Sequence, residues 1–124
     1  METYPNVHLD LGARIGWSCF LDREKYRDFL IRYSDRILFG TDIADRPLDE
    51  QTMVTVRRYH RCFEILETDR ILNAGFFPPP GGEKREIKGL ALPVDVLEKI
   101  YYRNAVRLYP RVKEVLEALG YPLE

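Results

Sequence analysis

The sequence predicts an α/β fold with a parallel sheet, and two short segments carry most of that prediction. Residues 7–11 alternate apolar and polar side chains after the turn signal Tyr4-Pro5-Asn6, a pattern that is typical of a strand. The run RILFGTD over residues 36–42 is apolar on both faces and ends abruptly in Gly-Thr-Asp, as buried parallel strands do. Strand, helix and strand then follow within about 36 residues, which indicates a βαβ unit with a right-handed crossover.

The segment between the two strands has the spacing of an amphipathic helix, and Asp22 is its predicted N-cap. Its apolar side chains fall at i, i+3, i+4 and i+7, and they are Tyr26, Phe29, Leu30 and Tyr33. Ser34-Asp35 closes this helix. We therefore expect it to cover one face of the sheet.

The second half of the chain predicts helices around one irregular segment. After a polar loop at residues 43–48, Asp49 is a plausible N-cap for a helix that runs to about Thr68. Residues 73–89 form the predicted irregular segment, with PPPGG at its centre. A further helix is expected from Leu92-Pro93, followed by a last amphipathic helix that Gly120 ends. We expect a single domain over residues 1–124.

Composition excludes several classes of function. The 124 residues are 45% hydrophobic, and 19 basic and 20 acidic residues give a net charge of −1. Without a basic block, neither nucleic acid nor an anionic membrane is an expected partner. No signal peptide or transmembrane run is recognisable. Cys19 and Cys62 fit neither a disulfide framework nor a metal site, so we expect apolar packing roles in a reducing cytoplasm.

Two parallel strands do not make a stable sheet alone. Each strand would expose an unpaired edge, and the strand at residues 37–41 is apolar on both faces. Parallel strands of this kind need neighbours on both sides and covered faces. The chain is therefore expected to be part of a larger α/β structure.

Three blocks of the sequence resemble a known family. YPNVHLDLGARI, RILFGTD and GLALPVDVLEKIYYRNAVRLYP are similar, in that order, to the C-terminal part of amidohydrolase-related (amidohydrolase family 2) proteins. These are metal-dependent hydrolases and decarboxylases built on a TIM barrel. The resemblance implies a partial TIM (β/α)8 barrel made of its last two βα units plus C-terminal helices. Residues 7–11 would be strand seven and residues 37–41 strand eight.

Asp42 is the residue to which this resemblance assigns chemistry. It matches the family Asp at the end of strand eight, which implies a place at a divalent metal, with zinc expected. There it would accept a proton from the activated water and pass it to the leaving group. From the residues alone, a carboxylate at a strand end can instead cap the following turn. The family His-x-His pair is missing, because His8 and His60 are the only histidines, so we expect the isolated chain to bind no metal.

Other polar residues near the strand ends are weaker candidates. Arg14 can pair with a substrate carboxylate, or form a structural salt bridge to Asp10 or Asp42. Asp45 follows strand eight and could contact substrate or form a turn. His8 and Asp10 share one strand face, either as a pair near the metal or as a polar layer satisfied by neighbouring strands.

Several further residues are assigned structural roles. His60 lies among arginines and is expected on a solvated helix face, and Asn104 is expected to tie a helix end to the barrel. Trp17, Phe76 and Phe77 lie in predicted loops, where they either line a pocket or pack locally.

The leading hypothesis is a C-terminal portion of a metal-dependent hydrolase that acts on a small amide, ester or carboxylate substrate and is inactive alone. A truncated gene or a start assigned too late would explain the missing strands. Three alternatives stay open. They are a fragment of a metal-dependent decarboxylase, a non-catalytic module that self-associates or completes a partner's barrel, and a small free-standing enzyme around Asp10 and Asp42.

Overall fold

The computed structural model describes residues 1–42, 51–73, 86–121 and 123. Its first half is the predicted βαβ unit, with β1 at Leu9–Asp10, α1 at Arg23–Arg32 and β2 at Ile37–Leu38. Two 3-10 helices, Ile15–Phe20 and Ser34–Arg36, flank α1. β1 and β2 pair in parallel, with Leu9 opposite Ile37 and Asp10 opposite Leu38. The strand order and direction confirm the sequence prediction, although each strand is shorter than expected.

α1 begins where the sequence predicts. Asp22 is the N-cap, and its side chain accepts a hydrogen bond from the Lys25 backbone N–H at 2.9 Å. This cap satisfies one of the amide groups that a helix leaves unpaired at its start. Leu30 is fully buried, so the predicted apolar face does point to the core.

The segment at residues 73–89 is a correction to the prediction. Its two ends are paired, because β3 (Ile71–Asn73) and β4 (Glu86–Lys88) form an antiparallel hairpin. In each strand the two outer residues are exposed and the middle residue is buried. The buried residue is Leu72 in β3 and Ile87 in β4. The PPPGG run favours an irregular segment, and three residues on either side are too few for their alternation of exposed and buried side chains to be recognised as strands. Residues 74–85 lie outside the described part of the chain.

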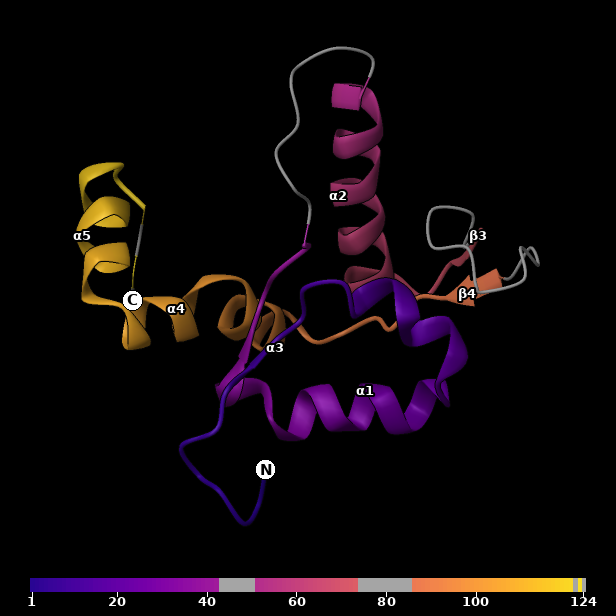
Figure 1. Ribbon diagram of the computed structural model, residues 1–124, viewed down its shortest axis with the longest axis horizontal. Helices are drawn as coiled ribbons and strands as arrows, with labels where there is room; N and C mark the ends of the chain where they lie inside the picture. Colours follow the sequence, from indigo (N-terminus) through magenta and orange to yellow (C-terminus); the bar gives the residue numbers. More distant parts are fainter. Residues whose placement is uncertain (43–50, 74–85, 122, 124) are drawn as a thin grey trace.

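α2 spans Gln51–Glu67 and leads into this hairpin. It agrees with the helix predicted to end near Thr68, but the proposed cap Asp49 and the loop at residues 43–48 are outside the described residues. Cys62, Ile65 and Leu66 are its buried side chains. In Figure 1 the first turns of α2 project away from the rest of the molecule, while its last turns join the core.

The predicted C-terminal helices are present in four consecutive pieces. α3 (Val94–Glu98), a π-helical stretch (Lys99–Arg103) and α4 (Asn104–Leu108) follow one another without a break, and α5 (Pro110–Ala118) comes after Tyr109. α5 buries no residue and stands apart from α1 and α2 in Figure 1. The π-helical stretch has no signal in the sequence, because its residues are ordinary helix formers.

The outer edge of β2 is closed, which corrects the expectation that each strand exposes an unpaired edge. The Phe39 backbone N–H donates to the Ile100 carbonyl of the π-helical stretch at 2.9 Å. The Asn104 side-chain amide donates to the Ile37 carbonyl at 2.8 Å and to the Ser34 carbonyl at 2.6 Å. The helix thus occupies the position in which a third strand would pair.

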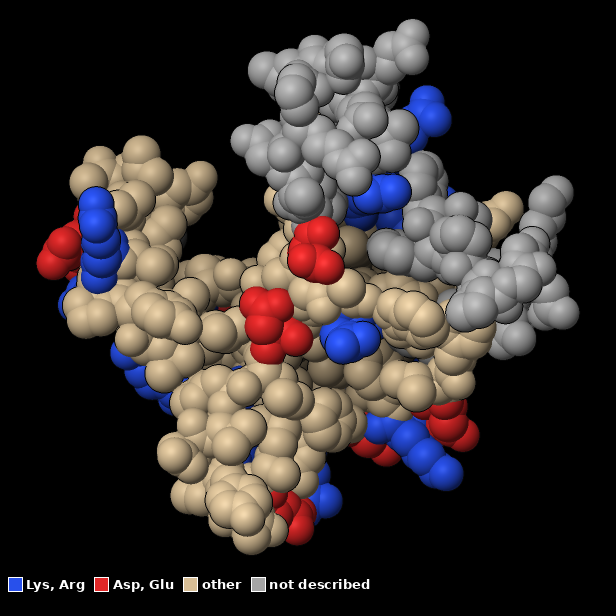
Figure 2. Space-filling model, viewed as in Figure 1, with Lys and Arg blue, Asp and Glu red and all other residues tan. Residues whose placement is uncertain are grey.

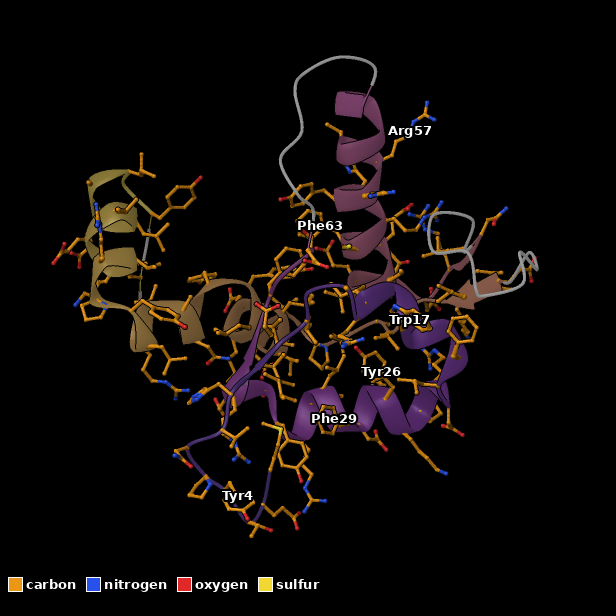
Figure 3. All side chains as sticks on the ribbon, in the orientation of Figure 1. Tyr4, Trp17, Tyr26, Phe29, Arg57 and Phe63 are labelled. Carbon is orange, nitrogen blue, oxygen red and sulfur yellow. The ribbon has the colours of Figure 1, made fainter. Side chains whose placement is uncertain are left out.

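The core lies where α1, β2, α2 and α3 meet, and its fully buried side chains are Leu30, Ile37, Ile65, Leu66, Leu90 and Ile100. Beside it the centroids of the stacked Phe39 and Phe63 rings lie 5.4 Å apart, and Tyr101 meets both rings edge-on. Phe63 is labelled in Figure 3. Within the described residues, none of the helices combines the length and apolar character required to cross a bilayer.

Candidate functional site

Asp10 and Asp42 lie at the same end of the parallel strand pair. The Asp10 carboxylate accepts a hydrogen bond from the Gly12 backbone N–H, which is the geometry of an Asx turn. A β-carbon on Gly40 would lie only 2.7 Å from Asp10 Oδ2, and one on Gly12 would lie 3.6 Å from the β-carbon of Asp42. The two glycines therefore provide the space that the Asp10 carboxylate occupies beside Asp42.

The backbone of Asp42 is in the left-handed region, with φ at 56°. Few residues other than glycine adopt this conformation, and Asp and Asn do so most readily. The side chain is exposed, and no hydrogen bond or ion pair links its carboxylate to another described residue. The turn that Asp42 could cap follows it in the chain and lies outside the described residues.

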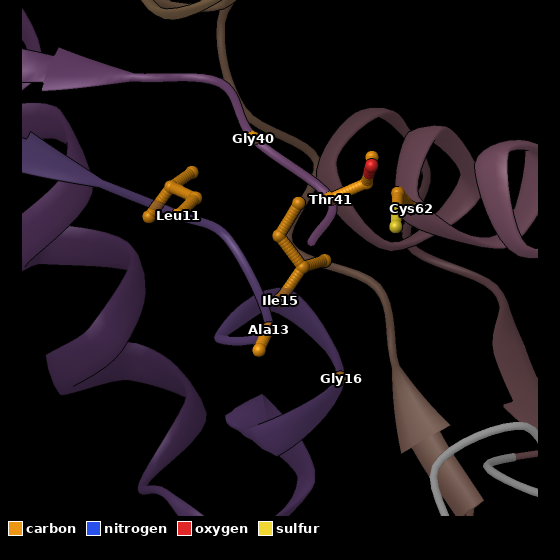
Figure 4. Close-up of a pocket in the computed structure, with 7 residues that line it drawn as sticks. All are labelled: Leu11, Ala13, Ile15, Gly16, Gly40, Thr41 and Cys62. Carbon is orange, nitrogen blue, oxygen red and sulfur yellow. The ribbon is translucent and has the colours of Figure 1, made fainter. Parts of the chain in front are cut away.

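A small apolar pocket lies behind this strand end (Figure 4). It has room for about one water molecule, and the residues that line it are Leu11, Ala13, Ile15, Gly16, Gly40, Thr41 and Cys62. Cys62 is a buried free thiol, and burial raises its pKa, so it behaves as the small apolar residue that the sequence predicts. Thr41 and the α2 residue Cys62 both line this pocket, so the Thr41 side chain lies on the α2 side of the chain that follows β2.

Arg14 and His8 do not form the pairs that were considered for them. Arg14 follows β1 and is exposed, and no ion pair joins it to Asp10 or Asp42 in the described residues. His8 Nδ1 lies 3.2 Å from the Asn6 carbonyl and is not bonded to Asp10. The strand end therefore carries the two carboxylates, and the described residues show no ion pair between either of them and Arg14.

The other sequence candidates fall in structural positions or outside the described chain. His60 is exposed on α2 as predicted, and Asn104 is 3% exposed and ties α4 to β2. Trp17 lies 5.4 Å from Phe20 within one 3-10 helix, which is local packing, and it is labelled in Figure 3. Asp45, Phe76 and Phe77 lie outside the described residues.

The fit of a metal ion depends on the donors that this strand end supplies. A catalytic zinc site needs three protein ligands and an open position, whereas Asp10 and Asp42 are two. Among the described residues, no group of three or more His, Cys, Asp or Glu side chains could hold a metal ion. Acidic and basic groups are interspersed on the face shown in Figure 2, without a dominant sign. The described residues alone therefore do not fit a resident divalent metal.

Sequence reasoning identified Asp42 and Asp10 but missed two features of the site. The first is the Asx turn, whose signal is the Asp10-Leu11-Gly12 spacing. The second is that the C-terminal helix closes the outer edge of β2: the tie through Asn104 was expected, but its partner Ile37 and the Phe39–Ile100 hydrogen bond lie more than 60 positions away in the chain and have no local signal.

Comparison with known proteins gives one match. A family model described as amidohydrolase matches residues 1–111, which include both strands, Asp42 and the helices through α4. The searches of curated proteins and of solved structures returned no match to this chain. The family is typically metal-dependent and its fold is a TIM barrel, whereas the described residues form a mixed α/β structure with two small sheets and no closed barrel. Since the family model covers most of its length, the chain belongs to the amidohydrolase family.

Proposed function

We propose that this chain is the C-terminal portion of a metal-dependent amidohydrolase-like hydrolase and supplies the last two βα units of its barrel. The observation that carries the proposal is the parallel β1–β2 pair with Asp42 at its C-terminal end, within a chain that the family model matches. In TIM-barrel enzymes, reacting groups sit at the C-terminal ends of the strands. The proposed substrate is a small molecule with an amide, ester or carboxylate group.

Asp42 is proposed as the proton-transfer carboxylate and as one metal-site residue of the complete barrel. A divalent metal, with zinc the proposed ion, would supply water activation by bringing the pKa of water to about 7. In the complete barrel, Asp42 would accept the proton of the attacking water and return it to the leaving group. Its exposed side chain, without a hydrogen bond to another described residue, suits a group that must exchange protons. Because the described residues do not complete a metal site, the chain alone is proposed to be inactive.

Arg14 and Asp45 are proposed to contact the substrate. Arg14 follows the C-terminal end of β1 in the chain, and its guanidinium group suits a bidentate contact with a substrate carboxylate. Asp45 lies three positions after Asp42 in the chain. A cytoplasmic location is also proposed, on the basis of the buried free thiol of Cys62.

The experiment combines this chain with a separately produced segment that carries the first six βα units of an amidohydrolase-family barrel. Zinc binding is measured by calorimetry, and hydrolysis is measured on a panel of small amides and esters. Zinc binding and hydrolysis are expected only for the combination. Asp42→Asn should lower the hydrolysis rate by about 10²–10⁴-fold, whereas Asp28→Asn, an exposed control on α1, should not change it.

Two outcomes would redirect the proposal. Wild-type hydrolysis rates in the Asp42→Asn combination would refute the role of this carboxylate. Release of carbon dioxide from carboxylate substrates, without hydrolysis of the panel, would assign decarboxylation instead.

A further inference from the structure

The two edges of the small parallel sheet differ. The outer edge of β2 is closed by the Ile100 carbonyl and the Asn104 amide, whereas β1 has β2 as its only neighbour in the sheet of the described residues. The Leu11 N–H donates to the Leu38 carbonyl at 3.0 Å. Because backbone groups alternate in direction along a strand, the N–H and C=O groups of His8 and Asp10 point away from β2.

The segment before β1 is held on the side of β2, away from this open edge. The Arg36 guanidinium group, next to β2, donates to the Met1 carbonyl at 2.7 Å and to the Tyr4 carbonyl at 3.2 Å. Val7, just before the strand, is 40% exposed. The open edge thus combines unpaired backbone groups with an exposed apolar side chain, and such edges pair readily with another strand.

We propose that a second copy of this chain occupies the open edge, with the two β1 strands antiparallel and Leu9 on the two-fold axis. In this register, His8 of each copy lies directly opposite Asp10 of the other. Both residues present their backbone groups to the partner, so each His8–Asp10 pair exchanges two backbone hydrogen bonds. Their side chains lie on the same face and place an imidazole against a carboxylate in both pairs.

Polar complementarity is what favours a second copy as the occupant. A strand that reads His8-Leu9-Asp10 is complementary to itself when it is reversed, because each pair sets an imidazole N–H donor against a carboxylate acceptor, and cross-strand polar pairs of this kind stabilise a sheet. The four strands would follow the order β2, β1, β1, β2. Both outer edges of that sheet are closed by the C-terminal helices, so association ends at the dimer and does not extend to a fibre.

The dimer is a property of the chain without the rest of a barrel and is independent of the proposed catalytic role. In a complete barrel the preceding strand would take the same edge. Dimerisation is measured without metal or substrate, so the absence of a dimer would not count against the proposed hydrolase function. Likewise, absence of hydrolysis in the combined segments would not count against the dimer.

The first measurement is the mass of the full chain by sedimentation equilibrium over a range of concentrations. The expected result is a reversible monomer–dimer equilibrium that ends at twice the 14.6 kDa chain mass. His8→Lys should tighten the dimer and His8→Glu should weaken it, each by about 2- to 30-fold for the two pairs together. A monomer at every concentration, growth beyond the dimer, or an unchanged dissociation constant in both variants would overturn the proposal.

The second measurement fixes the register and does not depend on affinity. In Leu9→Cys the two thiols face each other across the two-fold axis as a non-hydrogen-bonded pair, where α-carbons are about 4.5 Å apart. Mild oxidation should therefore link this variant into a disulfide dimer. His8→Cys is the matched control, because its thiol faces Asp10 of the second copy. Equal crosslinking of Leu9→Cys, His8→Cys and the wild type would refute the register, and far-UV circular dichroism verifies that each variant is folded.

Discussion

The contact between Asn104 and β2 gives the sharpest prediction about stability. The Asn104 side-chain amide is the donor for two backbone carbonyls, those of Ser34 and Ile37. Asn104 and Ser34 are each 3% exposed, and Ile37 is fully buried, so water cannot replace the amide. Substitution therefore leaves two buried acceptors without a partner.

The size of the effect follows from this count. Leaving a buried polar group unsatisfied costs about 1–3 kcal/mol, and for two acceptors we expect Asn104→Ala to lose about 2–6 kcal/mol of the free energy of unfolding. Asn104→Leu keeps the branched shape of the side chain without a donor and should lose at least a similar amount. The free energy of unfolding of a small domain is about 5–15 kcal/mol in total. Each variant is therefore expected to lose a large part of it.

Urea unfolding followed by far-UV circular dichroism measures this loss, and thermal unfolding should show a Tm lower by roughly 10 °C. Asn6→Ala is the matched control, because Asn6 is exposed and its substitution should stay within about 0.5 kcal/mol. A loss below about 0.5 kcal/mol in both Asn104 variants would refute the idea that this amide holds the C-terminal helix on the strand.

Three further predictions concern protonation and the strand end. Burial raises the pKa of both Cys62 and Tyr26, so both stay neutral when folded, while unfolded Cys and Tyr ionise near pH 8.5 and 10. The contribution of these two groups to the free energy of unfolding should therefore be constant below about pH 8 and fall as the pH rises further, and the alkaline slope measured by urea titration should be smaller in Cys62→Ala/Tyr26→Phe. Gly40→Ala should lose about 1–3 kcal/mol, because its β-carbon would meet the Asp10 carboxylate. Adding Asp10→Ala should recover most of that loss, and strictly additive effects in the double-mutant cycle would contradict the contact. Asp42→Gly should raise the free energy of unfolding by about 0.5–1 kcal/mol by relieving the left-handed backbone; a decrease in urea unfolding would show instead that the side chain has a structural role.

The βαβ unit could be predicted from the sequence because its signals are local. Asp22 and the spacing from Tyr26 to Tyr33 define α1, and the apolar run at residues 36–42 defines β2. The strand-end position of Asp42 follows from that run alone, whereas its metal-site role came from the family resemblance and stays a proposal.

The features that the sequence did not reveal depend on contacts between distant segments. The β3–β4 hairpin pairs Leu72 with Ile87 across a long connection, and its strands are too short for a periodic signal. Asn104 was expected to tie a helix end to the barrel, but its partner, the Ile37 carbonyl, could not be named, because no hydrophobic pattern encodes a contact made by a side-chain amide. The proximity of Asp10, Gly12 and Gly40 likewise follows from the strand register.

The position of α5 implies that the chain does not unfold as one cooperative unit. This helix begins at Pro110, near the end of the family match at residue 111, and no side chain on it is buried. A helix of this length has little stability in isolation, so its amide hydrogens should exchange with solvent far sooner than those of α1, whose Leu30 is fully buried. The C-terminal end is thus expected to open and close on its own while the βαβ unit remains intact.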